Sequence, residues 1–224
     1  MRLSVIIPAR DEAETITEAV VSAFEAGAAE VVVADGGSSD ATMELARRAG
    51  AMAISDPSPR GRRLNLAAAA TSGEILLFLH ADSRLPEGAA DAIAIAIREG
   101  ACGGGFKIRF REEARRLDLV AAMINLRSAL TRAPWGDQAQ WIRREIFEQT
   151  GGFLETSLMD DYELSLRMKR LGKTVVLRER VVTSGRRFLD RGILVTTATN
   201  WWIILRWRLG ASADTLTKIY RRGN

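Results

Sequence analysis

The most constraining feature of the sequence is an apolar run that stops abruptly at a group of polar residues. Residues 75–79 are all large and apolar, and His80, Asp82 and Arg84 follow within five positions. Such a run suits a strand that is buried on both faces, and ligands of open α/β sheets bind beyond the carboxyl ends of these strands. We therefore expect Asp82 at the functional edge of a sheet, as a divalent-metal ligand. Capping of the next helix is the alternative role.

The first part of the chain alternates between short apolar strands and amphipathic helices. Strands are expected at residues 3–8, 31–34 and 51–55, with intervening helices that end at Gly27 and Gly50. A β-α-β-α-β pattern predicts a mostly parallel sheet with helices on both faces. We therefore predict an α/β fold built on a Rossmann-like central sheet.

The alternation continues after the central strand and weakens after residue 110. The remaining expected elements are helices at 62–71, 86–100, 112–130 and 159–172, and strands at 102–110, 138–142 and 174–177.

Composition narrows the class of protein. The chain of 224 residues has a net charge of +4, and its arginine clusters suit phosphate or anionic lipid better than nucleic acid. A single cysteine, Cys102, excludes an internal disulfide. No stretch reaches the roughly 18–20 apolar residues of a membrane span, and the N-terminus reads as a strand rather than a signal peptide. We expect a cytoplasmic protein, with the inner face of the membrane as an alternative location.

Acidic residues stand at the boundaries of several expected elements. Asp35 follows the second strand and Asp82 the fourth, Glu12 follows the first, and Asp160 and Asp161 begin a late helix. Taken singly, each acid can be a cap that the helix dipole favours. Taken together, they predict one shared site, because parallel strands end at the same edge of a sheet.

Five segments of the chain occur in the order and spacing of a known family. They are SVIIPARDEAETI, VVVADGGSSDAT, ILLFLHADSRLP, GDQAQWIRREIFEQTGGF and LMDDYELSLRMKRLG, and they cover about residues 3–177. The series resembles the inverting nucleotide-sugar glycosyltransferases of family 2, which have the GT-A fold. The resemblance is closer to a small bacterial subgroup with LHAD in place of the usual Asp-x-Asp. It implies transfer of a sugar from a nucleotide diphosphate donor, UDP first, to a hydroxyl acceptor with inversion.

The weakening of the alternation after residue 110 predicts how the chain is divided. Residues 1–187 would form one GT-A domain, with a nucleotide-binding half at 1–110 and an acceptor half at 111–187. Residues 188–224 would form an amphipathic helical segment rich in Trp and Arg. That segment suits a membrane interface, which fits a lipid-linked acceptor. Packing on the domain, or in a homodimer, is the alternative.

The donor site implied by the resemblance lies in the first half. Its nucleotide-binding residues, placed by the family motifs, are Pro8, Ala9, Arg10, Glu12, Asp35, Gly36, Arg60, Arg63, Asn65 and His80. Arginine also has an independent reason to bind diphosphate, because its planar fork matches phosphate oxygens. Solvated helix surface is the alternative for each arginine. Asp11 departs from the family pattern, in which Asn is more usual.

The cofactor implied by the resemblance is Mg²⁺ or Mn²⁺, held by Asp82 in the position of the second acid of Asp-x-Asp. The metal would neutralise charge on the diphosphate leaving group. His80 stands where the first acid is expected. It can bind the metal, hydrogen-bond the ribose or pack at the strand end, and we favour the hydrogen bond. The sequence leaves metal dependence open.

The catalytic residues implied by the resemblance are Asp161 and Asp160, which match the family's Glu-Asp motif. Inversion in one displacement requires a base opposite the leaving group, and Asp161 matches that base. Trp135, Asp137 and Gln138 are candidate acceptor residues, because Trp can stack on a sugar face. A turn beside a core aromatic is the alternative for these three.

Two other functions compete with glycosyl transfer. One is a catalytically silent nucleotide-sugar-binding or membrane-docking module, which the substitution of an acid by His80 favours. The other is a nucleotidyltransferase on a similar sheet, although PARDEAETI lacks the glycine- and arginine-rich loop expected for that chemistry.

Overall fold

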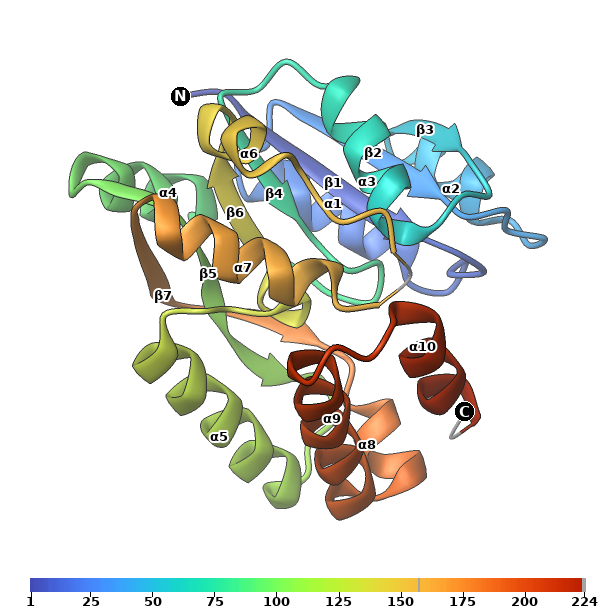
Figure 1. The fold of residues 1–224 in the computed structure, drawn as a ribbon. Helices are drawn as coiled ribbons and strands as arrows, with labels where there is room; N and C mark the ends of the chain where they lie inside the picture. Colours follow the sequence, from blue (N-terminus) through green and yellow to red (C-terminus); the bar gives the residue numbers. More distant parts are fainter. Residues whose placement is uncertain (157, 223–224) are drawn as a thin grey trace.

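A seven-stranded sheet with helices on both faces forms the centre of the protein (Figure 1). The computed structural model describes residues 1–156 and 158–222. In chain order the elements are β1 (Leu3–Ala9), α1 (Ile16–Glu25), β2 (Glu30–Asp35), α2 (Thr42–Arg48), β3 (Met52–Ser55), α3 (Arg60–Ala69), β4 (Ile75–Phe78), α4 (Ala89–Arg98), β5 (Ala101–Phe110), α5 (Arg115–Thr131), the 3₁₀ turn η1 (Gly136–Gln138), β6 (Gln140–Arg143), α6 (Arg144–Thr150), α7 (Asp160–Leu171), β7 (Lys173–Thr183), α8 (Arg186–Arg191), α9 (Ile193–Arg208) and α10 (Ala213–Arg222).

The order of the strands confirms the predicted α/β class. The sheet runs β3-β2-β1-β4-β6-β5-β7. β1, β2, β3 and β4 are parallel to their neighbours among these four, β5 is parallel to β7, and only β6 runs antiparallel, between β4 and β5. The sheet is therefore mostly parallel, as the alternation of strands and helices predicted.

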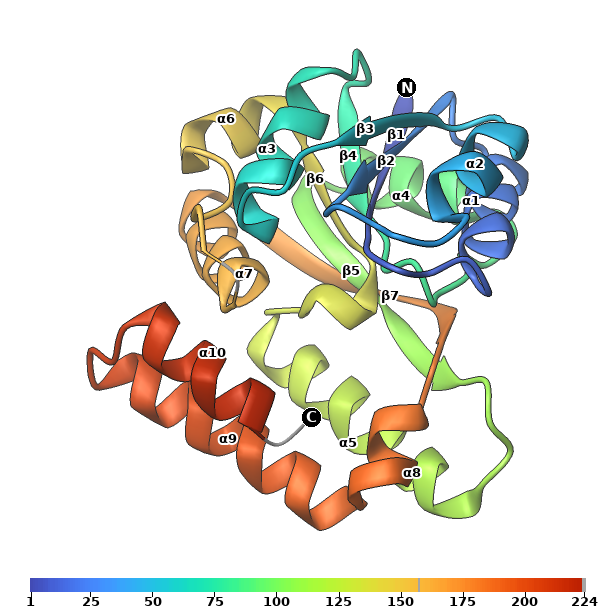
Figure 2. The same ribbon diagram turned by 90° about the vertical axis from the view of Figure 1, so that its right-hand side faces the viewer.

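Alternate residues of the central strands enter separate cores on the two faces of the sheet. Val5 and Ile7 of β1 belong to the core that includes residues of α1, α2 and α4. Ile6 belongs to the core that includes residues of α3, α6 and α7. Figure 2 shows these two groups of helices on opposite faces. Burial on both faces explains why the strands read as continuous apolar runs rather than as alternating ones.

Two predicted strands differ from the observed ones. The strand expected at 138–142 begins at Gln140, because residues 136–138 form the turn η1. The strand expected at 174–177 extends over Lys173–Thr183, because it pairs with β5 along most of its length. β7 lies at the edge of the sheet. Charged residues such as Arg178 and Arg180 are therefore exposed to water, and they make the strand hard to recognise in the sequence.

Four helices gather beyond the carboxyl ends of β5 and β7: α5, α8, α9 and α10 (Figures 1 and 2). α9 is fastened to α7 by two side-chain hydrogen bonds: Trp207 Nε1 donates to Glu163 Oε1 at 2.5 Å, and Arg208 Nε donates to the Tyr162 hydroxyl at 2.9 Å. The predicted domain boundary at 187–188 falls within α8, and the division into halves stays a prediction. Among the described helices, none combines the length and the apolar character needed to cross a bilayer.

Candidate active site

Asp35 organises the turn that follows β2. It lies opposite Ala9 in the parallel register of β1 and β2 and is only 1% exposed. Its carboxylate accepts hydrogen bonds from the N–H groups of Gly37 (2.9 Å) and Ser38 (3.0 Å) and from the hydroxyls of Ser38 and Ser55. Burial acts to raise the pKa of Asp35, but these hydrogen bonds outweigh burial and lower it. Asp35 is therefore an ionised residue at the edge where the first strands end.

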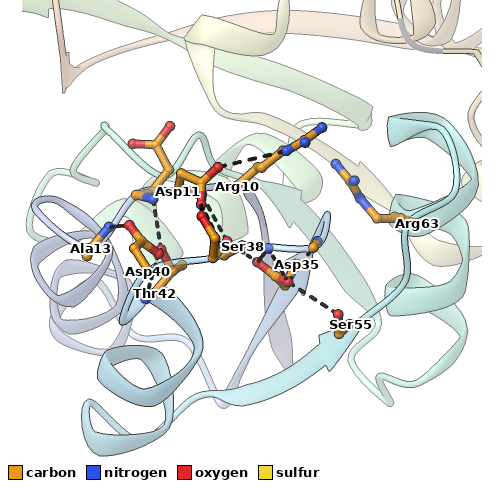
Figure 3. A network of polar contacts seen from close by, with 12 residues as sticks. Arg10, Asp11, Ala13, Asp35, Ser38, Asp40, Thr42, Ser55 and Arg63 are labelled. Atoms are coloured by element: carbon orange, nitrogen blue, oxygen red, sulfur yellow. Dashed lines mark hydrogen bonds and ion pairs between the residues drawn. The ribbon is translucent and has the colours of Figure 1, made fainter.

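The loops after β1 and β2 are joined by hydrogen bonds through Asp11 (Figure 3). The Asp11 N–H donates to Ser38 Oγ at 2.9 Å, and the Ser39 N–H donates to Asp11 Oδ1 at 2.8 Å. Asp11 has a φ of +54°, a left-handed conformation that Asp and Asn tolerate better than most residues. Asp11 therefore adopts a conformation that is equally open to Asn, the more usual residue at this position of the family. The same junction includes Glu12, whose N–H donates to Thr42 Oγ1 at 2.8 Å.

Two arginines face one another above this turn. Figure 3 shows Arg10 from the loop after β1 and Arg63 from α3 pointing toward one another. A Cβ on Gly36 would lie 2.0 Å from Arg63 Nη1, so a glycine is what lets Arg63 pack over the turn. Burial, followed by repulsion from Arg60 and Arg10, lowers the pKa of Arg63, and its Nε is buried without a partner among the described residues. Arg10 Nε lies 3.9 Å from Asp11 Oδ2, and Arg63 Nη1 donates to the Ser58 carbonyl at 3.5 Å. The N–H groups that these two guanidinium groups keep free suit an anion such as a diphosphate.

Arg60 and Asp160 form an ion pair next to His80. Arg60 Nη1 donates to both oxygens of Asp160, at 2.7 and 2.8 Å, and Arg60 Nη2 lies 3.2 Å from His80 Nε2. Asp160 is 1% exposed. Because guanidinium can only donate, His80 Nε2 accepts, and the imidazole is neutral with its proton on Nδ1. Burial, and then the charge of Arg60, lower the pKa of His80.

A cavity of about 630 Å³ opens beside these residues. Its polar end is lined by His80, Asp82, Trp135, Asp137 and Asp161. These side chains come from the loop after β4, from η1 and the residue before it, and from the first turn of α7. The fold therefore brings together the acids of the two predicted halves.

Two backbone N–H groups orient the carboxylate of Asp161. Gly136 donates to Oδ2 at 2.7 Å and Tyr162 donates to Oδ1 at 2.7 Å. A Cβ on Gly136 would lie 2.8 Å from both Asp161 Oδ2 and His80 Nε2, so this close approach requires glycine. Asp161 is thus held at the wall of the cavity, with lone pairs left to accept a proton from a ligand.

Asp137 and Arg127 both keep unused hydrogen-bonding capacity at the cavity wall. Burial raises the pKa of Asp137 to about 6, and its Oδ1 is buried without a partner among the described residues. Arg127 lies over the Trp135 ring, with its Cζ 3.3 Å from the ring centroid. Burial lowers the pKa of Arg127 to about 10, and its Nε and Nη1 have no described partner. A hydroxyl-bearing ligand can donate to the acid and accept from the guanidinium.

The sequence did not single out Arg127 or Gly136. Arg127 lies within an amphipathic helix and carries no motif, and its proximity to Trp135 depends on how the chain turns back after α5. The only local signal for Gly136 is its place in the GDQ segment.

Four predicted site residues, Asn65, Gln138, Ala9 and Pro8, make their contacts within the protein. The Asn65 amide donates to the Phe153 carbonyl at 2.9 Å and accepts from the Phe153 N–H at 2.8 Å. Gln138 is 0% exposed, and its side chain donates to the Phe106 carbonyl at 2.9 Å and accepts from the Ser128 hydroxyl at 2.5 Å. Ala9 is buried, and its carbonyl accepts from the Gly36 N–H at 2.9 Å. Pro8, next to Ala9 in β1, pairs with Ala34 of β2.

The residues around Asp82 fit a metal that takes few protein ligands. Residues 1–156 and 158–222 contain no group of three or more His, Cys, Asp or Glu arranged to hold a metal. Asp82 Oδ1 accepts from the Ser83 hydroxyl at 3.1 Å. Burial, and then repulsion from Asp82, raise the pKa of Glu12 despite its hydrogen bond from Thr15. A single, partly exposed carboxylate at the cavity wall matches Mg²⁺, which typically binds one or two carboxylates, substrate phosphates and water.

Solved structures share this fold at low sequence identity. TarS of S. aureus has a TM-score of 0.60 and 20% identity, over 83% of this chain and 35% of that one. The mannosyltransferase PcManGT from Pyrobaculum calidifontis, in complex with GDP-Man and Mn²⁺, has a TM-score of 0.59 and 23% identity, over 82% and 56%. Glucosyl-3-phosphoglycerate synthase from Mycobacterium tuberculosis, with Mn²⁺, UDP and glucosyl-3-phosphoglycerate, has a TM-score of 0.57 and 23% identity, over 81% and 70%.

These similarities confirm the GT-A fold. This chain spans about a third of the length of TarS and little more than half of PcManGT. None of the curated proteins compared with the sequence gives a match. The model of the family described as glycosyl transferase family 2 matches residues 4–151. Since that stretch is more than half of the chain and contains the loops after β1, β2 and β4, the protein belongs to glycosyl transferase family 2.

Proposed function

We propose that the protein transfers a sugar from a nucleotide diphosphate sugar, UDP-linked in the first instance, to a hydroxyl acceptor with inversion at the anomeric carbon. The observation that carries the proposal is the position of Asp161. It lies at the wall of the same cavity as Asp82 and His80, with both carboxylate oxygens oriented by backbone N–H groups. Inverting transfer requires such a base on the acceptor side of the reacting carbon.

In this proposal the donor lies over the loops after β1 and β2. Arg10 and Arg63 hold the diphosphate, because each presents a guanidinium above the turn and Arg63 keeps a buried N–H without a described partner. Asp35 and Gly36 lie on the base and ribose side. The complexes of TarS with UDP-GlcNAc and of PcManGT with GDP-Man support a nucleotide-sugar donor for this fold.

Asp82 is the residue that would hold Mg²⁺ or Mn²⁺, with the diphosphate completing the ligands. When bound, the metal would neutralise charge on the leaving diphosphate. Structures of glucosyl-3-phosphoglycerate synthase with UDP and Mn²⁺ or Mg²⁺ support this choice of ion. His80 supports the site from beneath as a neutral hydrogen-bonding residue, since its Nε2 is engaged by Arg60.

The chain's own part in the reaction is proton transfer and orientation. The acceptor oxygen attacks the anomeric carbon, Asp161 takes the hydroxyl proton, and the bond from that carbon to the diphosphate oxygen breaks. Asp137 and Arg127 position the sugar or acceptor hydroxyls, because both retain free hydrogen-bonding capacity at the cavity wall. Asp160 has a positioning role, since its pair with Arg60 fixes the first turn of α7 from which Asp161 projects.

We also propose a cytoplasmic location, and a division into a nucleotide-binding half at 1–110 and an acceptor half at 111–187. Residues 188–220 would contact a membrane or a second copy of the protein. The acceptor would be lipid-linked. A catalytically silent module would differ from an enzyme in one respect: it would bind the donor without turnover.

Calorimetric titration of UDP and GDP into the full chain, with and without Mg²⁺ or Mn²⁺, tests the proposal. We expect one nucleotide to bind more tightly with metal. Arg63→Ala should weaken that binding by at least about tenfold, because a charge-assisted contact is lost. Arg62→Ala, an exposed neighbour on the same helix, should leave it unchanged. Absence of nucleotide binding under every condition would remove the donor site and the proposed function with it.

A further inference from the structure

The cavity that holds Asp161 is much larger than its polar end. Its other walls are mostly apolar and come from α5 and α9, through side chains that include Val120, Met123, Ile124, Leu194 and Ile203. The groups that sugar transfer needs occupy only the region around the carboxylates. The rest of the cavity therefore suits an apolar part of a ligand.

Several of the apolar side chains that line this cavity are also exposed to water. The exposed fractions are 64% for Leu119, 54% for Met123, 84% for Leu194 and 56% for Trp201. Together they form an apolar mouth between α5 and α9. Apolar residues gathered around the opening of a cavity mark a binding surface rather than scattered surface residues.

An arginine without an acidic partner among the described residues, Arg187, lines the same cavity, and Arg191 follows on the same helix. Arg187 Nε and Nη2 and Arg191 Nη2 are buried without a hydrogen-bond partner among the described residues. No carboxylate in residues 1–156 and 158–222 forms an ion pair with Arg187 or Arg191. Burial, and then the charge of Arg191, lower the pKa of Arg187 to about 10. The Arg187 guanidinium stacks on the Tyr220 ring, with its Cζ 3.8 Å from the ring centroid, and it has no anionic partner among the described residues. Its unpartnered N–H groups can therefore donate to an anionic ligand group.

The apolar wall is held in place before any ligand binds. Leu117, Val120 and Ala121 of α5 share a core with Phe188 and Ile193. On the other side, the hydrogen bonds from α9 to α7 fix its last turns beside the active site. A preformed wall lowers the entropic cost of binding a flexible chain.

We propose that the acceptor is an anionic amphiphile: its hydroxyl reaches Asp161, its apolar chain lies between α5 and α9, and its phosphate-like group is held by Arg187. This inference rests on the proposed transferase function and names the acceptor class for the same site. This choice of ligand follows from the lining of the cavity, because one cavity joins the proposed base to the apolar wall and to Arg187.

The test compares three probes in calorimetric titrations of the full chain, each below the concentration at which it forms micelles. The probes are 10-hydroxydecyl phosphate, 3-hydroxypropyl phosphate and 1,10-decanediol. Each buried methylene is worth about fourfold in affinity. We therefore expect the long phosphate to bind at least about tenfold more tightly than the short one, and more tightly than the neutral diol.

Two matched variants on α5 test where the apolar chain of the ligand binds. Met123 lines the cavity and Leu126, which is 60% exposed, does not. In Met123→Glu the long and the short phosphate should bind with nearly equal affinity. In Leu126→Glu the preference for the long phosphate should be preserved. Both probes carry the same phosphate, so the ratio of their affinities cancels the direct repulsion between that phosphate and the new glutamate. Arg187→Met, which keeps the apolar stem, should reduce the preference for long phosphate over diol by at least about fivefold.

The outcomes separate this inference from the function on which it rests. Nucleotide binding together with equal affinity for the two phosphates, or a chain-length ratio that survives Met123→Glu, would overturn the apolar acceptor site alone. An undiminished phosphate preference in Arg187→Met would overturn the assignment of the anionic group. A chain-length ratio without nucleotide binding would overturn the transferase function and the acceptor role with it.

Discussion

A single guanidinium nitrogen of Arg60 bridges both carboxylate oxygens of Asp160, at 2.7 and 2.8 Å. The pair joins the start of α3 to the start of α7, one hundred positions later in the chain. It therefore ties the part of the protein that carries the anion site to the helix that carries Asp161. Both residues matched family motifs, and in the structure they are paired with one another.

Removal of Arg60 should destabilise the protein, because Asp160 would keep a buried charge without a partner. We expect Arg60→Met to lower the free energy of unfolding by about 3–5 kcal/mol in urea titrations. The double variant Arg60→Met with Asp160→Leu should recover most of that loss, since it removes both charges. Arg62→Met, on the exposed side of α3, is the control. A loss below about 1 kcal/mol in Arg60→Met would show that water compensates Asp160.

Replacement of Asp161 by Asn should remove catalysis and preserve donor binding. Asn keeps an oxygen that can accept the Gly136 N–H but cannot take a proton from the acceptor. We expect kcat to fall by about 10²–10⁴-fold, with the dissociation constant of the nucleotide unchanged within about threefold. Steady-state kinetics and calorimetry on the same preparation check both values. Asp118→Asn, an exposed acid on α5, should behave as the unaltered protein; normal turnover in Asp161→Asn would exclude this residue as the base.

The pKa of Asp137 predicts how stability depends on pH. Its value of about 6 in the folded protein exceeds the ordinary value of 3.8. The folded state therefore binds this proton more tightly than the unfolded chain does, and the contribution of Asp137 to stability falls as pH rises from about 4 to about 6. Asp137→Asn should raise the free energy of unfolding by about 1–3 kcal/mol at pH 8, and the gain should disappear near pH 4. Denaturation at both pH values measures the difference; an equal effect at pH 4 and pH 8 would contradict the assignment.

Asn65 should affect stability rather than nucleotide binding. Its amide closes two hydrogen bonds with the backbone of Phe153, and truncation leaves those groups without partners. Asn65→Ala should cost about 1–3 kcal/mol for each unsatisfied group, measured by urea denaturation. The nucleotide affinity should match that of the unaltered protein, in contrast to Arg63→Ala. A selective loss of nucleotide binding with normal stability would show that Asn65 belongs to the donor site.

Much of the fold could be predicted from local patterns in the sequence. The apolar runs around Val5, Val32 and Leu77 indicated buried parallel strands, because both faces of this sheet are covered by helices. β7 was harder to delimit, since an edge strand exposes charged residues such as Arg178. The extent of pairing with β5 depends on contacts between distant segments, which no local pattern encodes.

The candidate site, too, could be predicted from the sequence only in part. By itself the sequence determined which acids follow the strands, because a strand end and its loop are local features, and Asp82 and Asp161 do line one cavity. The contacts of the other residues depend on packing between distant segments. The tertiary structure pairs Arg60 with Asp160, turns Asn65 and Gln138 into the protein, and places Arg127 over Trp135. The physical reason is that hydrogen bonds and charges in a buried site are satisfied by whichever groups the fold brings within about 3 Å, and that proximity is a property of packing rather than of spacing along the chain.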